Sequence, residues 1–172
     1  MSARTSASER RQLDQELRVT ARGAYLRCMP PQRHDFTDEN VDSAIEFIID
    51  NGAEDRGQTI SYSRVFDAAG LPPPQDLHFG GESQLVTLFM ARLHYRCRER
   101  ALPPLDALVV HVAGDRTGFP GVGYFRVNGH ADPLSERTTP GRQVAATAFW
   151  EAQKTECTNW GERSRRGQVV RN

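Results

Sequence analysis

The chain has 172 residues with 22 basic and 22 acidic side chains and is 38% hydrophobic, which predicts one domain with a sizeable core and appendages. No run approaches the roughly 18 apolar residues of a membrane-spanning helix, and MSARTSASERR lacks the apolar segment of a signal peptide. Cys28, Cys97 and Cys157 are too widely spaced to indicate a disulfide framework. We therefore expect a soluble, cytoplasmic protein whose cysteines are reduced and buried.

The charges are unevenly distributed along the chain. Residues 1–33 hold seven arginines against three acids, residues 34–56 hold eight acids against one arginine, and residues 151–172 hold five bases against three acids. These regions can pair within one molecule or between two. Lys154 is the only lysine. Arginine makes bidentate contacts to phosphate and carboxylate, although a GC-rich genome explains this composition more simply.

Two helices are predicted before residue 56. The first covers residues 8–28 and stops at the following prolines. The second begins after Thr37, an N-cap candidate that precedes acids suited to the positive end of a helix, and continues to Gly52. Its buried stripe is predicted to contain Val41, Ala44, Ile45, Ile48 and Ile49.

The segment GQTISYSRVFDAAGLPPPQ predicts a short extended stretch at residues 59–62 and a brief helix that is capped by Ser61 or Ser63 and ends at Gly70. After a proline spacer and two glycines, residues 82–100 predict a strongly amphipathic helix. The sides of this helix away from the core carry Arg92, Tyr95, Arg96 and Arg98.

The stretch LPPLDALVVHVAGDRTGFPGVGYF predicts a β-hairpin. Its prolines form a stiff connector, and residues 107–112 form a strand that is apolar on both faces and therefore central in its sheet. Residues 113–121 form a glycine-rich loop with Arg116 at its tip, and residues 122–127 return as a second strand.

A last helix is predicted after Pro140, with Trp150 and Trp160 on or beside its apolar stripe. Their packing on the core is the simpler interpretation, whereas an exposed tryptophan stripe would mark a dimer or partner interface. The final segment RSRRGQVVRN is basic and is expected to be mobile, so it could add nonspecific affinity for phosphate.

The order of strand, helix, spacer, amphipathic helix and hairpin is typical of winged-helix DNA-binding domains. We therefore predict an α+β fold in one compact domain: an N-terminal helical extension at residues 1–56, basic and then acidic, a winged-helix-like core at residues 57–130, and a C-terminal helix with a basic tail at residues 131–172.

Residues 57–125 resemble the DNA-binding domain of O6-alkylguanine DNA alkyltransferases and alkyltransferase-like proteins. GQTISYSRVFDAAGL is similar to the family's Gly-x-Val-Thr-Thr-Tyr-Gly-x-Leu-Ala segment, and the predicted hairpin is placed like its Val-Val and Gly-Gly-Tyr hairpin. The LPPL to PGxGYF pattern is also similar to uncharacterised bacterial proteins. The resemblance implies that Tyr62 occupies the position of the family's DNA-contacting tyrosine, with core packing as the alternative role.

Two departures from the family pattern limit what the resemblance implies. The family's Pro-Cys-His-Arg nucleophile motif is replaced by Leu105, Asp106, Ala107 and Leu108, so alkyl transfer to a thiol is not predicted. The family's arginine at the start of the recognition helix is replaced by Glu82, Ser83 and Gln84.

No other catalytic or metal site is predicted. His94 and Cys97 are three residues apart on a predicted helix, and His78, His111 or His130 could complete a zinc site, but no CxxC pair accompanies them. Cys157 or Ser135 would need a base, and His130, Asp132 and Glu136 show no recognised triad spacing. The acids from Asp35 to Asp42 suit a helix start better than a cation site.

The preferred function is therefore nonenzymatic binding of double-stranded DNA without a cofactor, in a regulatory or damage-sensing role. The predicted contacts are Tyr62, Arg92, Tyr95, Arg96, Arg98 and Arg116. The leading alternative is a protein-interaction module, an adaptor or inhibitor, that binds a partner or a second copy through the acidic helix or the Trp150/Trp160 helix. A third is a small hydrolase or transferase with a site near His78, His94, His111 and the PGxGY loop.

Overall fold

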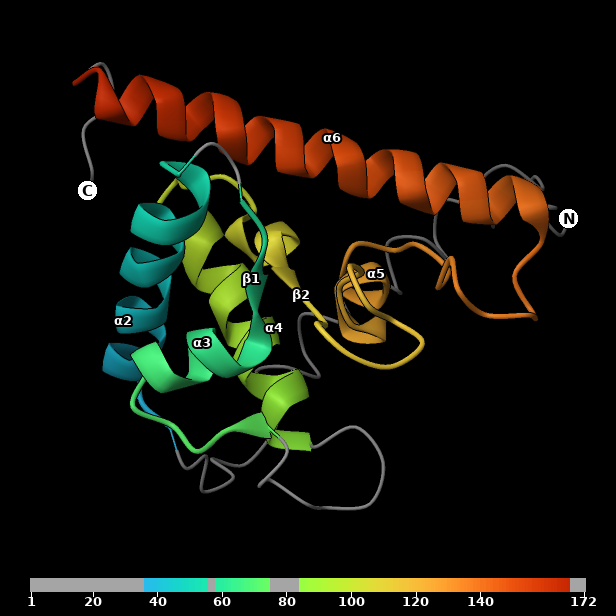
Figure 1. Ribbon diagram of the computed structural model, residues 1–172, viewed down its shortest axis with the longest axis horizontal. Helices are drawn as coiled ribbons and strands as arrows, with labels where there is room; N and C mark the ends of the chain where they lie inside the picture. The colour runs from blue at the N-terminus through green and yellow to red at the C-terminus, as the bar shows by residue number, and fades with distance from the viewer. Residues whose placement is uncertain (1–35, 56–57, 75–83, 168–172) are drawn as a thin grey trace, which may run out of the picture. The chain divides into compact units, whose positions relative to one another are not determined.

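Figure 1 shows a computed structural model of the chain, which describes residues 36–55, 58–74 and 84–167. The described elements include helices and a two-stranded sheet, which confirms a mixed α+β fold. In chain order they are α2 (Asp38–Ile48), the π-helical turn η1 (Ile49–Ala53), β1 (Ile60–Ser61), α3 (Tyr62–Ala68), α4 (Gln84–Glu99), the 3₁₀ turn η3 (Leu105–Leu108), β2 (Val109–Val110), α5 (Val122–Val127) and α6 (Pro140–Arg165). The predicted helix at residues 8–28, Cys28, His78 and residues 168–172 lie outside the described residues.

Helix α2 forms where its sequence signals predict it. The Thr37 N–H donates to Asn40 Oδ1 (2.7 Å) and the Asn40 N–H donates to Thr37 Oγ1 (3.4 Å), so a capping box starts the helix. The predicted apolar stripe is fully buried. The helix runs on as η1, which includes Gly52 and ends at Ala53. A Cβ at position 52 would lie 3.0 Å from Ile60 and 3.1 Å from Leu108, so the chain packs closely at this glycine.

The sheet differs from the predicted hairpin. β1 and β2 pair in parallel, with Ile60 opposite Val109 and Ser61 opposite Val110, and the chain between them includes α3 and α4. Parallel strands need such a crossover, whereas a hairpin joins antiparallel strands. The predicted central strand at residues 107–112 is reduced to β2, which follows the 3₁₀ turn η3. The structure therefore does not confirm a winged-helix core.

The predicted return strand at residues 122–127 is wrong, because Val122–Val127 forms helix α5. Tyr124 and Phe125 are consecutive and both buried, an arrangement that a strand with one covered face does not give. Gly129, which lies just beyond the helix with φ +78°, provides the glycine that commonly ends helices. Alternation over six residues does not distinguish a strand from a short helix.

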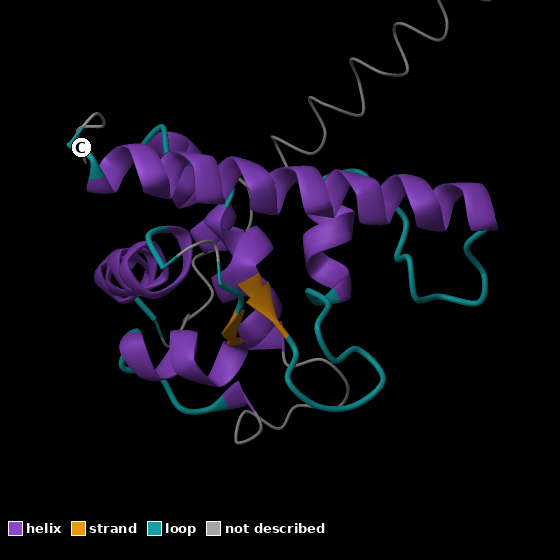
Figure 2. Ribbon diagram, turned by 45° about the horizontal axis from the view of Figure 1, so that its top comes forward, coloured by secondary structure: helices purple, strands orange, loops and turns teal. Residues whose placement is uncertain are grey.

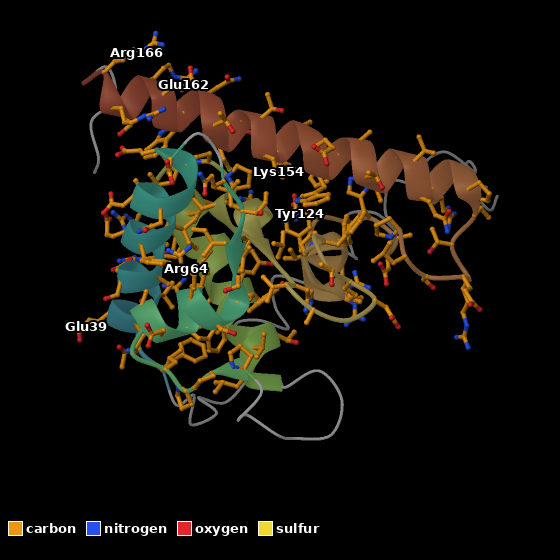
Figure 3. The ribbon with its side chains drawn as sticks, in the orientation of Figure 1. Glu39, Arg64, Tyr124, Lys154, Glu162 and Arg166 are labelled. Atoms are coloured by element: carbon orange, nitrogen blue, oxygen red, sulfur yellow. The ribbon has the colours of Figure 1, made fainter. Side chains whose placement is uncertain are left out.

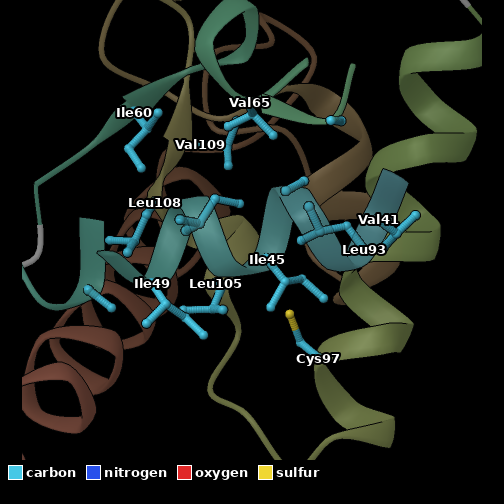
Figure 4. Close-up of a cluster of buried hydrophobic side chains, with 14 of the residues drawn as sticks. Val41, Ile45, Ile49, Ile60, Val65, Leu93, Cys97, Leu105, Leu108 and Val109 are labelled. Carbon is cyan, nitrogen blue, oxygen red and sulfur yellow. The ribbon is translucent and has the colours of Figure 1, made fainter. Parts of the chain in front are cut away.

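Helix α6 runs along one side of the other described elements (Figures 1 and 2). Its buried residues belong to two groups of packed side chains. Its C-terminal half covers the larger group, in which α2, α3, α4 and η3 surround residues such as Ile45, Leu93 and Leu105 (Figure 4). Its N-terminal half packs through Trp150 on α5 and the end of β2. Trp160 is buried in the larger group, so packing on the core, the simpler interpretation of both tryptophans, is confirmed.

Candidate nucleic-acid interface

Two of the predicted DNA contacts, Arg92 and Arg96, belong to a row of ion pairs between α4 and α2. Arg92 binds both carboxylate oxygens of Asp38 (2.9 and 2.9 Å), and Arg96 binds both of Asp42 (2.9 and 2.8 Å). One turn later, Arg100 donates to Glu46 (2.6 Å). We call this row, Arg92–Asp38, Arg96–Asp42 and Arg100–Glu46, the α2–α4 ladder. Arg100 directly follows the last residue of α4. Because the partners advance by four residues on both sides of the row, α2 and α4 run in the same direction.

The ladder neutralises the arginines that were expected to bind phosphate. Glu99 also accepts from Arg92 (2.8 Å) and Arg96 (3.2 Å), so these two arginines face three carboxylates. Hydrogen bonds from the arginines, mainly from Arg92 to Asp38 and from Arg96 to Asp42, hold the pKa values of both aspartates below their ordinary 3.8. Three acids of residues 34–56, Asp38, Asp42 and Glu46, therefore pair with arginines at residues 92–100, which belong to neither of the basic regions noted in the sequence.

Arg98 and Tyr95 lie outside the ladder. Arg98 is exposed on the last turn of α4, and no carboxylate within residues 36–55, 58–74 and 84–167 forms an ion pair with it. Tyr95 is half-buried and packs edge-on against the His94 ring, with 5.5 Å between centroids. Of the three predicted arginines on α4, Arg98 is thus the one without an ion pair to any carboxylate that the structure describes.

Arg116 does not project from the glycine-rich loop as expected. Its guanidinium donates to both oxygens of Asp132 (2.9 and 3.0 Å) and to the Pro120 carbonyl (3.1 Å), and its side chain is only 20% exposed. Burial alone would raise the pKa of Asp132, but hydrogen bonds from Arg116 and from the Leu134 N–H hold it below its ordinary value. Arg116 is therefore a brace between the loop and residues 131–134.

Tyr62 connects helix α3 to the same loop. It opens α3, next to the N-cap Ser61, and its hydroxyl accepts a hydrogen bond from the Gly121 N–H (2.8 Å). Its ring lies 4.8 Å from that of His111 at the other end of the loop. A Cβ at position 121 would lie 2.9 Å from the Tyr62 hydroxyl, so a larger residue there would force the Tyr62 side chain to shift. Tyr62 thus contacts both ends of the segment at residues 111–121, which contains the predicted loop.

Arg64 is an exposed cation that the sequence analysis missed. It lies two residues after Tyr62 on α3 (Figure 3), with its guanidinium 5.3 Å from the centre of the Phe47 ring. From the sequence, Tyr62 is assigned to the extended stretch at residues 59–62 and Arg64 to the brief helix after it, and only the Ser61 alternative for the cap places both in one turn. The polar contact of Arg64 is with the amide oxygen of Asn51 (3.5 Å), and no ion pair of the described chain joins its guanidinium to a carboxylate.

Asp106, at the position of the family's nucleophile in the resemblance, pairs with His94. Asp106 Oδ2 lies 2.9 Å from His94 Nδ1, and both side chains are buried. His94 thus contacts a carboxylate that the sequence analysis did not pair with it. Cys97 lies in the core, where burial raises the pKa of its thiol. Across residues 36–55, 58–74 and 84–167, no three His, Cys, Asp or Glu side chains gather as metal ligands would.

Among the residues weighed for nucleophilic catalysis, no hydrogen bond of the described chain joins a nucleophile's side chain to the side chain of a base. His130 stacks on Phe149 with 4.2 Å between ring centroids, and Asp132 is bound to Arg116. Ser135 Oγ accepts from the Arg137 N–H. Cys157 is buried and its thiol contacts the Pro104 carbonyl (3.4 Å). This part of the chain therefore shows no nucleophile beside a base.

Comparison with known proteins gives no relative: no family model, no curated protein and no solved structure matches the chain. No helix among the described residues is long and apolar enough to cross a membrane.

Proposed function

We propose that the protein binds double-stranded DNA without chemistry, in a regulatory or damage-sensing role, through α3, the loop at residues 111–121 and the last turn of α4. Tyr62, Arg64, Tyr95 and Arg98 are the proposed contacts. We assign no DNA contact to Arg92, Arg96 and Arg116, because their ion pairs with carboxylates hold α2, α4 and the loop in place. The observation that carries the proposal is the junction at Tyr62, because the tyrosine implied by the resemblance to contact DNA is joined to the loop expected to flank the duplex.

The resemblance to the alkyltransferase DNA-binding domain is part of this proposal. β1, α3, α4, η3 and β2 follow one another in the order of the resembling segments, but residues 122–127, which stand in place of the second strand of the family's hairpin, form helix α5. Asp106 takes the nucleophile's place and is hydrogen-bonded to His94. Asp106 has no thiol, and its carboxylate is buried and hydrogen-bonded to His94, so it cannot accept an alkyl group as the family's cysteine does. These residues therefore support binding without alkyl transfer.

The acidic helix and the tryptophan-bearing helix, which suggested a protein-interaction module, both make their contacts within the chain. The acidic helix α2 directs Asp38, Asp42 and Glu46 to α4, and both tryptophans of α6 are buried. Neither feature therefore argues for a partner surface.

The salt dependence of DNA binding tests which arginines take part. The slope of log K against log salt is about −0.9 for each phosphate neutralised. Contacts from Arg64 and Arg98 alone predict a slope of about −2, whereas the participation of Arg92, Arg96 and Arg116 as well predicts about −4.5. The measurement is the fluorescence anisotropy of a labelled duplex between about 50 and 200 mM salt.

The matched variants are Arg98→Gln and Arg142→Gln. Arg142 is also exposed, at the first turn of α6, and serves as a control for the loss of one positive charge. We expect Arg98→Gln to weaken binding and to reduce the slope by about 1, and Arg142→Gln to leave both nearly unchanged. Absence of binding at the lower salt concentration, or equal losses in both variants, would refute the proposal.

A further inference from the structure

His94 and Asp106 form a buried polar pair that connects α4 to η3. His94 Nδ1 lies 2.9 Å from Asp106 Oδ2, and the two side chains are 8% and 3% exposed. Removing such groups from water is costly, and apolar side chains of similar size often serve stability as well or better. A role in stability alone is therefore a weak explanation of this pair.

The pair fixes which nitrogen of His94 is directed outward. A carboxylate only accepts hydrogen bonds, so Nδ1 carries the proton that binds Asp106. Nε2 lies at the opposite edge of the ring and forms no hydrogen bond with the described residues. It is also not one of their unpartnered side-chain atoms that are closed off from solvent. Nε2 therefore reaches the surface, where it can take up a proton and donate to an external group.

The surface at Nε2 belongs to the side of α4 that carries two of the proposed DNA contacts. The Tyr95 ring packs edge-on against the His94 ring, with 5.5 Å between centroids. Arg98 lies four residues after His94, a spacing that makes two residues neighbours on a helix. Arg98 is exposed and forms no ion pair with a described carboxylate, so its charge attracts an anion and repels a metal cation. A phosphate oxygen is the ligand that this surface favours.

We propose that His94 is a further phosphate contact of the DNA-binding surface. Duplex binding places a phosphate oxygen at Nε2, which takes up a proton and donates to that oxygen, while Asp106 holds the ring through Nδ1. Asp106 is thus a positioning residue, because it orients the ring and stabilises its positive charge. The inference rests on the proposed function and adds to it a dependence on pH: because a proton is bound with the DNA, affinity increases as the pH falls.

The other titratable groups around this pair do not supply such a dependence near neutral pH. Burial raises the pKa values of the Cys97 thiol on α4, the Cys157 thiol on α6 and the Tyr124 hydroxyl on α5, so all three stay neutral. Arg98 stays charged. On α2, arginines hold the pKa values of the ladder aspartates below their ordinary value, so these stay ionised. The ring of His94 is the group of this neighbourhood that is expected to change charge.

The salt dependence of duplex binding at two pH values measures this charge. At about pH 8, contacts from Arg64 and Arg98 predict a slope of log K against log salt of about −2, and protonation of His94 at about pH 6 makes it more negative by up to about 0.9. His94→Gln, whose amide can still donate to Asp106, should show the same slope at both pH values. His130→Gln removes a histidine that stacks on Phe149 and is the matched control, in which the difference should persist.

The outcomes distinguish this inference from the proposed function. Absence of duplex binding by the full chain would overturn both. Binding whose slope depends on Arg98 but not on pH, or a pH difference that persists in His94→Gln, would overturn the role of His94 and leave the proposed function intact. Tryptophan fluorescence of each variant verifies that it is folded under the conditions of the binding measurement.

A chemical probe tests the exposure of Nε2 in the full, unsubstituted chain. Diethyl pyrocarbonate acylates neutral imidazole nitrogens that reach solvent, and mass spectrometry of peptides identifies the modified histidine. We expect His94 to react in the free protein and to be protected by saturating duplex DNA, whereas His130 should react equally in both. A His94 that does not react in the free protein, or that reacts equally with and without the duplex, would overturn the proposal.

Discussion

Replacing Arg116 tests whether this arginine is a brace or a DNA contact. The Arg116→Gln change removes two hydrogen bonds to Asp132, at 2.9 and 3.0 Å, and one to the Pro120 carbonyl, at 3.1 Å. Exposed ion pairs contribute about 0.2–1 kcal/mol, and hydrogen bonds to charged groups contribute about 1.5–3 kcal/mol. Because the two side chains are only 20% and 16% exposed, we expect an intermediate loss of about 1–2 kcal/mol in the free energy of unfolding.

A double-mutant cycle with Asp132→Asn isolates the pair. Urea unfolding, followed by the fluorescence of the two buried tryptophans, gives the free energy of each variant. We expect a coupling energy of about 1 kcal/mol between Arg116 and Asp132. Arg98→Gln is the control for the loss of an exposed charge, with an expected change within about 0.5 kcal/mol.

The outcomes of this cycle separate the two roles of Arg116. A brace predicts that Arg116→Gln loses stability and keeps its affinity for duplex DNA under conditions in which it remains folded. A coupling energy near zero, together with a large loss of affinity at unchanged stability, would show that Arg116 reaches phosphate and would refute its role as a brace.

Three further perturbations test the contacts that hold the fold together. The lowered pKa values of Asp38 and Asp132 contribute stability that is complete above their unfolded value of 3.8 and is lost as the pH falls through their folded values. Urea midpoints should therefore fall steeply below about pH 4, and less steeply in Asp132→Asn. A Cβ at Gly161 would overlap the Ala53 carbonyl, so Gly161→Ala should lower the free energy of unfolding by about 1–3 kcal/mol, as measured in urea, and an unchanged value would contradict the close packing of α6 on η1. Trp150→Phe leaves the Ala107 carbonyl without its hydrogen-bond donor and should lower the free energy of unfolding by about 1–3 kcal/mol. Thermal unfolding should show this as a lower midpoint, and an unchanged midpoint would contradict the hydrogen bond.

The elements predicted correctly are those with local signals. The start of α2 follows from Thr37 and the acids after it, and the start of α6 follows from Pro140, which stands in its first turn. The buried stripe of α2 follows from helical periodicity. Each of these signals lies within a few residues of the structure it specifies, so the sequence alone is sufficient.

The errors arose where a decisive contact is distant in sequence. Residues 122–127 alternate like a strand, but they pack as a helix because Tyr124 and Phe125 both bury against the group that contains Trp150. β2 pairs with β1, about fifty residues earlier, and nothing near Val109 indicates that partner. The resemblance to a hairpin-containing family supported the same error, since a glycine-rich loop between two apolar segments is common to both arrangements.

The α2–α4 ladder shows why exposed arginines on an amphipathic helix are weak evidence for nucleic-acid binding in a neutral protein. Arg92, Arg96 and Arg100 recur every four residues, and so do Asp38, Asp42 and Glu46. Matching periods on two helices allow every charge on one to meet a charge on the other, a relation that can be sought in a sequence by comparing the spacing of its acids and bases. A cation outside such a matched pair of rows is the better candidate for a phosphate contact. On α4 that residue is Arg98, whose removal should affect DNA affinity more than stability.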